Sequence, residues 1–357
     1  MCIALLRFFG LRIPQNDSTL VFSKLILSKY LIQKSHAFLD FVTMISLTIK
    51  NFRANLITML GITNPSTDVQ YRTISTEGKG AYDQLLIEYE GYEEDIIPAY
   101  LLIPKGNGPF PAVLIHHQHN SEWHLGKSEV CGIKGDPYNA FGPELAKNGI
   151  IVLAPDSVGF EDRRRNQKGT DKNEKTDSLQ YFNGMAYRMV HGKLLMTTVL
   201  NDAVKGINLL NCLSMVDANN IGIMGHSYGG NTSIFHAAID ERIRFTCASG
   251  SACSYKNKIA NETGIEMSLI IPGILNSMDI SDIVKCISPR KILIVSATDD
   301  IYSKDATDIV NKVRKELKES NEIDNVEHKH YEGSHALTAE RFEFIIDWVR
   351  KQALVGR

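Results

Sequence analysis

A serine flanked by glycines occupies a position typical of a nucleophile. The segment Gly-His-Ser-Tyr-Gly at 225–229 follows an apolar run at 221–224 and precedes a helix-like stretch. A tight turn from strand to helix forces its serine into a strained backbone conformation, and small residues on both sides relieve the crowding. The pattern predicts that Ser227 is an exposed nucleophile at a helix N-terminus. The alternative is a glycine-rich turn that carries a passive serine.

A carboxylate must follow this serine if the serine is to be activated. A hydroxyl is a weak nucleophile until a base takes its proton, and that base needs an acid to fix its tautomer. With a nucleophile in this kind of turn, the acid comes next in the chain and the histidine comes last. The strand-like run at 292–297 is followed by Thr298, Asp299 and Asp300. We predict Asp299 as the acid, with Asp300 as the alternative.

The base must come from one of three histidines near the C-terminus. His328 and His330 alternate within a strand-like segment, whereas His335 follows Gly-Ser in a loop before a helix-like stretch. A loop lets the imidazole reach across to a nucleophile on another element. We therefore predict His335 as the base. The alternative is a surface histidine that caps the following helix.

Two backbone N–H groups are expected to bind the oxyanion that forms when the serine attacks a carbonyl group. One usually belongs to the residue after the nucleophile, here Tyr228, and the other to a loop after an earlier strand. The strand-like run at 112–115 is followed by His116, His117, Gln118 and His119. We expect the second donor to be the N–H of His119, with that of Gln118 as the alternative.

Two other chemistries compete for the same residues. The histidines His116, His117, His119 and His124, with Glu122 or Glu129, have ligand types suited to zinc, but the stretch lacks H-E-x-x-H. The run Arg163–Arg165 offers charge for an anionic group, although such runs are usually solvated. No dinucleotide or phosphate-loop motif is complete. We expect neither a metal nor a cofactor.

The elements that must position these residues alternate between strand and helix. Segments 84–90 and 95–103 flank a glycine turn and predict an antiparallel pair. Short apolar runs then predict strands buried on both faces, at 112–117, 150–155, 221–225 and 292–297. Helical periodicity separates them, at 140–148, 194–210 and 304–319. This alternation predicts an α/β fold with a mostly parallel sheet flanked by helices. Segments 160–185 and 254–285 fit neither pattern, so we expect them to be lid or cap insertions.

The N-terminal region differs from the rest. Residues 1–60 carry seven Lys or Arg against two Asp, while the whole chain of 357 residues has a net charge of −2. Apolar residues recur at helical spacing, at Phe38, Val42, Ile45, Ile49, Phe52 and Leu56. We expect residues 1–80 to be a helical extension of a catalytic domain at 81–357. Its helices should pack on that domain or form a homo-oligomer contact, and a membrane-surface helix is the alternative.

Composition and charge argue against nucleic acid as a partner and against a membrane span. With a net charge near zero, no global basic field favours nucleic acid. The six cysteines form no C-x-x-C pair, and no uncharged apolar run reaches the length of a membrane span. The opening residues make a poor signal peptide because Arg7 interrupts them. We expect a cytoplasmic protein without a stable membrane span.

The sequence resembles the α/β-hydrolase superfamily, in particular its dienelactone-hydrolase-like and acetyl-xylan-esterase-like branch, in several blocks that follow the family's order. The matching pieces are IPAYLLIPKGNGPFPAVLIHH, ELAKNGIIVLAPD, IGIMGHSYGG, PRKILIVSATDD and GSHAL. The resemblance implies a small-molecule ester as substrate and an acyl-enzyme formed by Ser227, Asp299 and His335. Dienelactone hydrolases proper have Cys where this chain has Ser227. The alternatives are a prolyl-oligopeptidase-type peptidase and a non-catalytic binding protein of the same fold.

Overall fold

The computed structural model describes residues 47–63, 67–318 and 325–354. Within them one nine-stranded sheet has the order β1-β2-β3-β5-β4-β6-β7-β8-β9. The strands are β1 Tyr71–Gly78, β2 Tyr82–Glu90, β3 Ile96–Pro104, β4 Phe110–His116, β5 Ile151–Pro155, β6 Val216–His226, β7 Phe245–Ser249, β8 Lys291–Ala297 and β9 Val326–Tyr331. The first three strands and the β3–β5 pair are antiparallel, whereas every pairing from β5 to β9 is parallel. This is the expected α/β architecture.

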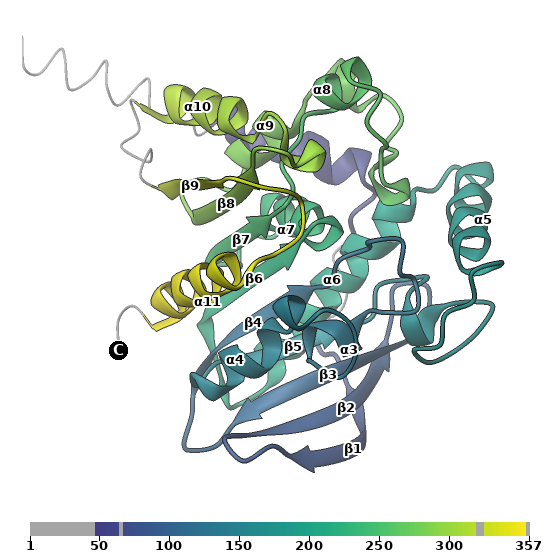
Figure 1. Ribbon diagram of the computed structural model, residues 1–357, viewed down its shortest axis with the longest axis vertical. Coiled ribbons are helices and arrows are strands. Elements are labelled where there is room, and N and C mark those ends of the chain that lie inside the picture. The colour runs from purple at the N-terminus through teal and green to yellow at the C-terminus, as the bar shows by residue number, and fades with distance from the viewer. Residues whose placement is uncertain (1–46, 64–66, 319–324, 355–357) are drawn as a thin grey trace, which may run out of the picture.

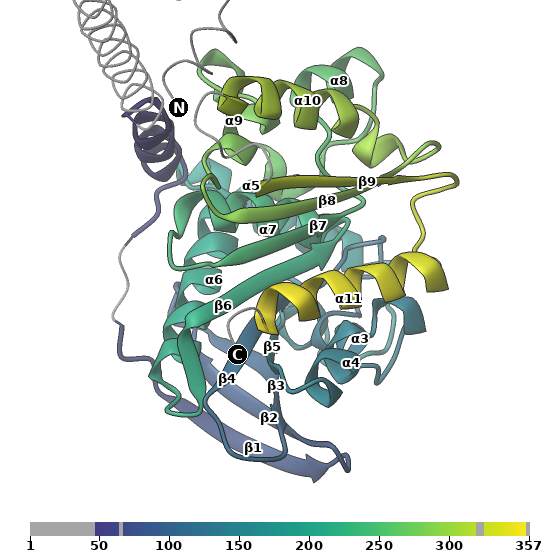
Figure 2. The ribbon, with the colours of Figure 1, turned by 90° about the vertical axis from the view of Figure 1, so that its left-hand side faces the viewer.

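Helices cover both faces of the sheet, as Figures 1 and 2 show. They are α3 Lys127–Val130, α4 Phe141–Lys147, α5 Asp177–Val190, α6 Leu195–Cys212, α7 Tyr228–Ile239, α8 Tyr255–Ala260, α9 Ile280–Lys285, α10 Ala306–Leu317 and α11 Ala339–Leu354. In β4 alternate side chains enter different cores. Leu114 packs in the core that includes α6 and α7, and Val113 packs in the core that includes α4 and α11. Such burial on both faces explains the continuous apolar strands.

The helix over 47–59 packs on the main body, as expected for this part of the N-terminal region. Ile49 and Leu56 are buried in the core shared with α6 and α7. Arg53 is also buried, and its guanidinium donates to the carbonyl oxygens of Ala238 and Cys286 and pairs with Glu241. Of the predicted apolar face, Phe38, Val42 and Ile45 lie outside the described residues.

Two strands were missing from the expected fold. Residues 71–78, which we assigned to a helical extension, form β1 at the antiparallel edge of the sheet. All eight residues of β1 are exposed, so the strand lacks the alternation of apolar and polar residues that identifies a half-buried strand. The other strand missing from the expected fold is β7, which has only five residues and lies between longer elements. The helical part of the extension therefore ends before residue 71 in the described structure.

Both expected insertions contain short helices near the carboxyl ends of the parallel strands. The segment 160–185 includes the first part of α5, and 254–285 includes α8 and α9. In Figure 1, α5 and α8 project beyond the two helix layers that flank the sheet. No helix in the described ranges is long and apolar enough to cross a membrane.

Candidate active site

Ser227 lies in the turn between β6 and α7, and its backbone is strained. Its φ is 56° and its ψ is −118°, a backbone conformation that residues other than glycine rarely adopt. The flanking glycines allow this turn because the backbone of the neighbouring loop approaches closely. A Cβ atom at Gly229 would lie 2.0 Å from the carbonyl oxygen of His116, and one at Gly225 would lie 2.3 Å from the carbonyl carbon of Gly229. The expected strand-turn-helix geometry is present.

His335 joins Ser227 to a carboxylate. Its Nε2 lies 2.8 Å from Ser227 Oγ, and its Nδ1 lies 2.9 Å from Asp300 Oδ1. The carboxylate accepts a hydrogen bond from Nδ1–H, which leaves Nε2 unprotonated and able to accept the serine proton. His335 comes from the loop between β9 and α11, as expected. The three side chains form an unbroken hydrogen-bonded series.

The carboxylate that accepts the hydrogen bond from His335 belongs to Asp300, so our prediction of Asp299 is wrong. Asp299 is exposed, and its backbone N–H donates to the carbonyl oxygen of Gly333. The chain turns directly after β8, so consecutive side chains point in different directions. Asp300 is 1% exposed and caps the short helix at Ile301–Ser303. The sequence presents two adjacent carboxylates, and the shape of the turn decides which one reaches the histidine.

The environment of Asp300 favours its ionised form. Burial alone would raise its pKa, but hydrogen bonds from His335, from Ser303 Oγ and from the N–H of Tyr302 outweigh burial and lower the pKa. An ionised carboxylate at this position stabilises the imidazolium that forms when His335 takes a proton. Sequence inspection had no signal for Ser303 as a partner of this carboxylate.

The two residues expected to supply the oxyanion donors line the same cavity as the serine. Tyr228 begins α7, so its N–H has no acceptor within the helix. His119 lines the same cavity as Ser227 and Tyr228, and in the described part of the chain its N–H donates to no backbone carbonyl. The alternative residue, Gln118, is buried, and its side chain donates to Glu129 Oε1 at 2.9 Å. Burial raises the pKa of Glu129 to about 7.

A cavity of about 360 Å³ opens above Ser227 and His335. This volume falls within the range of small-molecule sites. The two insertions supply part of the wall, with Ser178 from the first and Lys258 and Glu266 from the second. Lys258 is 2% exposed and burial lowers its pKa. Glu266 accepts hydrogen bonds from Tyr181 Oη and from the N–H of Ser268. The lid or cap positions expected for 160–185 and 254–285 agree with this lining.

The histidines considered as metal ligands face different partners. His116 contacts His236, with their ring nitrogens 3.2 Å apart, while His117 contacts the backbone of Gln118 and Ser157. His119 packs edge-on against Trp123. Among the described residues, one group of three acidic side chains has the spacing of a metal site, namely Asp156, Glu161 and Asp162. The ammonium of Lys127 lies within 2.8 Å of an oxygen of each, so these residues already share a cation.

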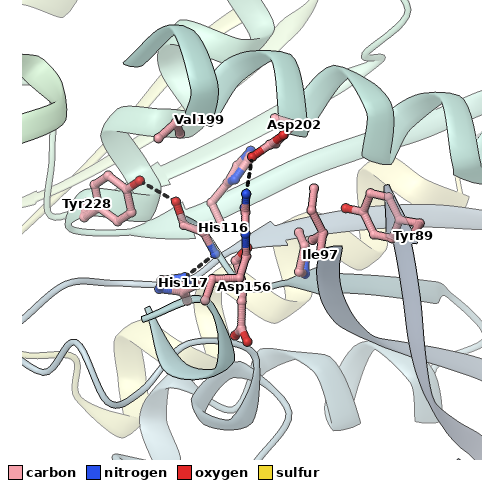
Figure 3. Close-up of a pocket in the computed structure, with 12 residues that line it drawn as sticks. Tyr89, Ile97, His116, His117, Asp156, Val199, Asp202 and Tyr228 are labelled. Carbon is pink, nitrogen blue, oxygen red and sulfur yellow. Dashed lines mark hydrogen bonds and ion pairs between the residues drawn. The ribbon is translucent and has the colours of Figure 1, made fainter. Parts of the chain in front are cut away.

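The arginine run is not an anion site, because two of its members are buried in internal ion pairs. Arg163 pairs with Asp95 and Asp202, and Arg164 pairs with Asp177. Arg163 also lines the small cavity drawn in Figure 3, about 20 Å³ in volume, which is room for roughly one water molecule. The sequence shows a charge run here, but its partners lie up to 68 positions away.

Comparisons with known proteins identify the family of this chain. The family model described as acetyl xylan esterase matches residues 51–262. The "Putative hydrolase YtaP" of Bacillus subtilis (strain 168) is 30% identical over 276 residues, covering 74% of this chain and 85% of that protein.

Solved structures show the same fold. A putative acetyl xylan esterase from Bacteroides fragilis NCTC 9343 has a TM-score of 0.70 at 17% identity, covering 87% of this chain and 88% of that one. A glucuronoyl esterase from Solibacter usitatus has a TM-score of 0.56 at 13% identity, covering 84% and 91%. The chain belongs to the acetyl xylan esterase family of the α/β-hydrolase fold and is a serine carboxylic-ester hydrolase.

Proposed function

We propose that this chain removes small acyl groups, acetate first, from a polar alcohol such as a carbohydrate, with Ser227, His335 and Asp300 as the catalytic residues. The observation that carries the proposal is the hydrogen-bonded series from Ser227 Oγ through His335 to Asp300 at the floor of the cavity. Membership of the acetyl xylan esterase family supports the acetyl group and the carbohydrate.

The first half of the reaction acylates the serine. His335 Nε2 takes the proton from Ser227 Oγ as the oxygen attacks the ester carbonyl carbon. The oxyanion then accepts hydrogen bonds from the backbone N–H groups of Tyr228 and His119. Asp300 stabilises the imidazolium and holds its Nδ1–H. His335 then returns the proton to the departing alcohol oxygen, leaving an acyl group on Ser227.

The second half repeats these steps with water. His335 Nε2 accepts a proton from a water molecule, whose oxygen attacks the acyl carbon of the Ser227 ester. The same two N–H groups bind the second oxyanion. As the bond between Ser227 Oγ and the acyl carbon breaks, His335 Nε2 returns the proton to Oγ, which releases the carboxylic acid and restores the Ser227 hydroxyl. Every proton transfer therefore uses one atom, His335 Nε2.

The polar part of the cavity lining supports a hydroxylated alcohol. Asn120, Ser121, Ser178 and Lys258 line this part, whereas Trp123, Ile265 and Met267 line an apolar part. A long apolar acyl chain packed over the polar part would take its groups out of water without giving them new partners, at a cost in binding free energy. An acetyl group beside Ser227 leaves the rest of the volume to a hydroxylated alcohol.

A substrate panel tests the proposal. It contains 4-nitrophenyl acetate, butyrate and octanoate, an acetylated methyl xyloside, a methyl glucuronoyl ester and peptide 4-nitroanilides. We expect the highest kcat/KM among the nitrophenyl esters for acetate, together with release of acetate from the xyloside. Faster cleavage of the anilides would favour the peptidase alternative. Faster cleavage of octanoate or of the glucuronoyl ester would reject the assigned acyl group.

Two expectations about the cellular form stay proposals. A cytoplasmic location is tested by fractionation with antibodies against the full chain. A homo-oligomer formed through the N-terminal helices is tested by analytical ultracentrifugation, and a monomer at all concentrations would reject it.

A further inference from the structure

The side chain of His117 holds two backbone groups on opposite sides of its ring. The N–H of Ser157 donates to its Nε2 at 3.1 Å, and its Nδ1 lies 2.8 Å from the carbonyl oxygen of Gln118. Because a backbone N–H can only donate, Nε2 must be unprotonated. The proton therefore sits on Nδ1, from which it donates to the Gln118 carbonyl.

The surroundings keep this tautomer in place. His117 is 2% exposed and packs edge-on against Phe160, with ring centroids 4.8 Å apart. Burial lowers its pKa to about 4, so the ring is neutral at neutral pH. Figure 3 shows His117 and Tyr228 beside the small cavity, with their hydrogen bonds drawn as dashed lines. Those bonds lead to the N–H and the hydroxyl of one residue, Ser157.

The bond to Gln118 fixes the direction of the next N–H. In a trans peptide the carbonyl oxygen and the following N–H point in opposite directions. The cis bonds in the described chain are Gly108–Pro109 and Ser288–Pro289, so the peptide between Gln118 and His119 is trans. With its oxygen held by His117, the N–H of His119 must point away from that ring. His119 lines the cavity that contains Ser227.

The loop that carries His117 lies directly against the turn that carries Ser227. A Cβ atom at Gly229 would lie 2.8 Å from the carbonyl oxygen of His117, so backbone touches backbone here. Tyr228 Oη lies 2.8 Å from Ser157 Oγ. Ser157 thus contacts both His117 and Tyr228, and Tyr228 is itself one of the two proposed oxyanion donors.

We infer that His117 is a positioning residue for the oxyanion hole: its Nδ1–H holds the Gln118–His119 peptide so that the His119 N–H faces the reacting carbonyl. This inference rests on the function proposed above. Rotation of the peptide would replace a donor with a carbonyl oxygen, which repels the developing negative charge. The effect of His117 is therefore confined to the transition state, because the ring itself does not touch the ester.

Two matched variants separate the two nitrogens of the ring. In His117→Asn the side-chain amide N lies near the former position of Nδ1 and still donates to Gln118. In His117→Gln the amide group reaches the position of Nε2, so it accepts from Ser157 but does not hold the Gln118 carbonyl. We expect His117→Gln to lower kcat with 4-nitrophenyl acetate by about 10² or more with little change in KM, as loss of one oxyanion donor does.

The Asn variant should retain kcat to within about tenfold of the wild-type value, since its hydrogen bond is kept at the cost of an imperfect fit. The affinity for a trifluoromethyl ketone, which forms an oxyanion on the serine, should fall in the Gln variant in proportion to kcat/KM. His328→Gln is the control, because His328 is also a histidine with a pKa lowered by burial and lies outside the cavity. Its kcat should be unchanged.

The outcomes distinguish this inference from the proposed function. A wild-type enzyme that is inactive on every ester of the panel overturns the proposed function. An active wild-type enzyme with equal kcat in the Gln and wild-type forms overturns the inference alone. Equal losses in the Asn and Gln variants, with ketone affinity unchanged, assign His117 to folding and also overturn it. If the Gln variant fails to fold, the ketone affinity of the Asn variant decides: a loss of more than about tenfold contradicts the inference.

Discussion

Two polar clusters in the described part of the molecule differ in whether their groups face a cavity. The triad cluster consists of Ser227, His335 and Asp300. The Lys127 cluster consists of Lys127, Asp156, Glu161 and Asp162. In the triad cluster the serine and histidine face a cavity of about 360 Å³. In the Lys127 cluster Lys127 is 1% exposed, and its ammonium contacts all three carboxylates.

The pKa values of Asp300 and Asp156, one carboxylate from each cluster, shift in opposite directions. Asp300 has a lowered pKa because hydrogen bonds outweigh its burial. Asp156 has a pKa raised to about 7, first through burial and then through the charge of Glu161, which together outweigh the attraction of Lys127. One cation is shared among several acids in the Lys127 cluster, whereas one acid serves one histidine in the triad. In the Lys127 cluster the charged groups pair with one another, so we expect this cluster to act on stability. In the triad cluster the nucleophile faces a cavity, so we expect this cluster to act on substrate.

The largest expected effect separates Ser227 of the triad cluster from Ser128, which lies beside the Lys127 cluster. Ser227→Ala should lower kcat by about 10⁴ or more, because the nucleophile is lost. Ser128 Oγ donates to Glu161 at 2.6 Å in the Lys127 cluster, so Ser128→Ala should lower the melting temperature and leave kcat near the wild-type value. Steady-state kinetics and thermal melts measure both. A Ser227→Ala enzyme with normal ester hydrolysis would contradict the assignment.

The second prediction concerns the adjacent carboxylates after β8. Asp300→Asn should lower kcat by about 10⁴, because an amide at this position favours the wrong tautomer of His335. Asp299→Asn should change kcat little, since its side chain is exposed. The kcat values of the two variants measured on one ester check this. The reverse ranking would restore Asp299 as the acid.

The third prediction concerns the Lys127 cluster. Lys127→Met leaves three carboxylates without their cation, and breaking a buried pair in this way costs about 3–5 kcal/mol of unfolding free energy. Lys147→Met is the matched control, because Lys147 forms an exposed i,i+3 pair with Glu144, and such pairs contribute about 1 kcal/mol or less. Urea unfolding measures both variants. Equal effects would show that the Lys127 cluster does not stabilise the fold.

The smallest effect is a pH dependence of stability. Burial lowers the pKa of His117 and His236 to about 4 and that of His226 to about 3. The unfolded chain binds protons at these residues below about pH 6.5, while the folded chain does not. They therefore lower the free energy of unfolding as pH falls from about 6.5 to 4.

The acidic groups act in the opposite direction. Glu129, with a pKa of about 7, adds stability as pH falls from about 7 towards 4.5. More histidines than such carboxylates are affected, so the melting temperature should fall with pH, and His236→Gln should flatten the slope. A melting temperature that rises between pH 6.5 and 4 would show that the raised carboxylates dominate.

The same comparison explains how far sequence inspection reached. Ser227 was predictable because a nucleophile turn is local, with its strand, glycines and helix contiguous in the chain. His335 was predictable from its loop. Asp299 and Asp300 could not be separated, because the direction of a side chain in a turn depends on hydrogen bonds to Tyr302 and Ser303.

The Lys127 cluster had no local signal. Its carboxylates lie 29 to 35 positions from the lysine, and no regular spacing in the sequence links them to it. From the sequence His117 was only a candidate metal ligand. Its role could not be predicted, because its backbone partners at Gln118 and Ser157 are brought to it only by the fold. The alternation of strand and helix was readable from hydrophobic periodicity, but the exposed strand β1 has no such periodicity.

The most direct test of the central claim is to trap the acyl-enzyme. The full-length enzyme is mixed with 4-nitrophenyl acetate, quenched in acid within the first turnover, digested and analysed by mass spectrometry. The account predicts a burst of nitrophenol and an acetyl group on the peptide that contains Ser227, with no such adduct in Ser227→Ala. Ester hydrolysis that proceeds with no adduct on Ser227, or with an adduct on another residue, would contradict it.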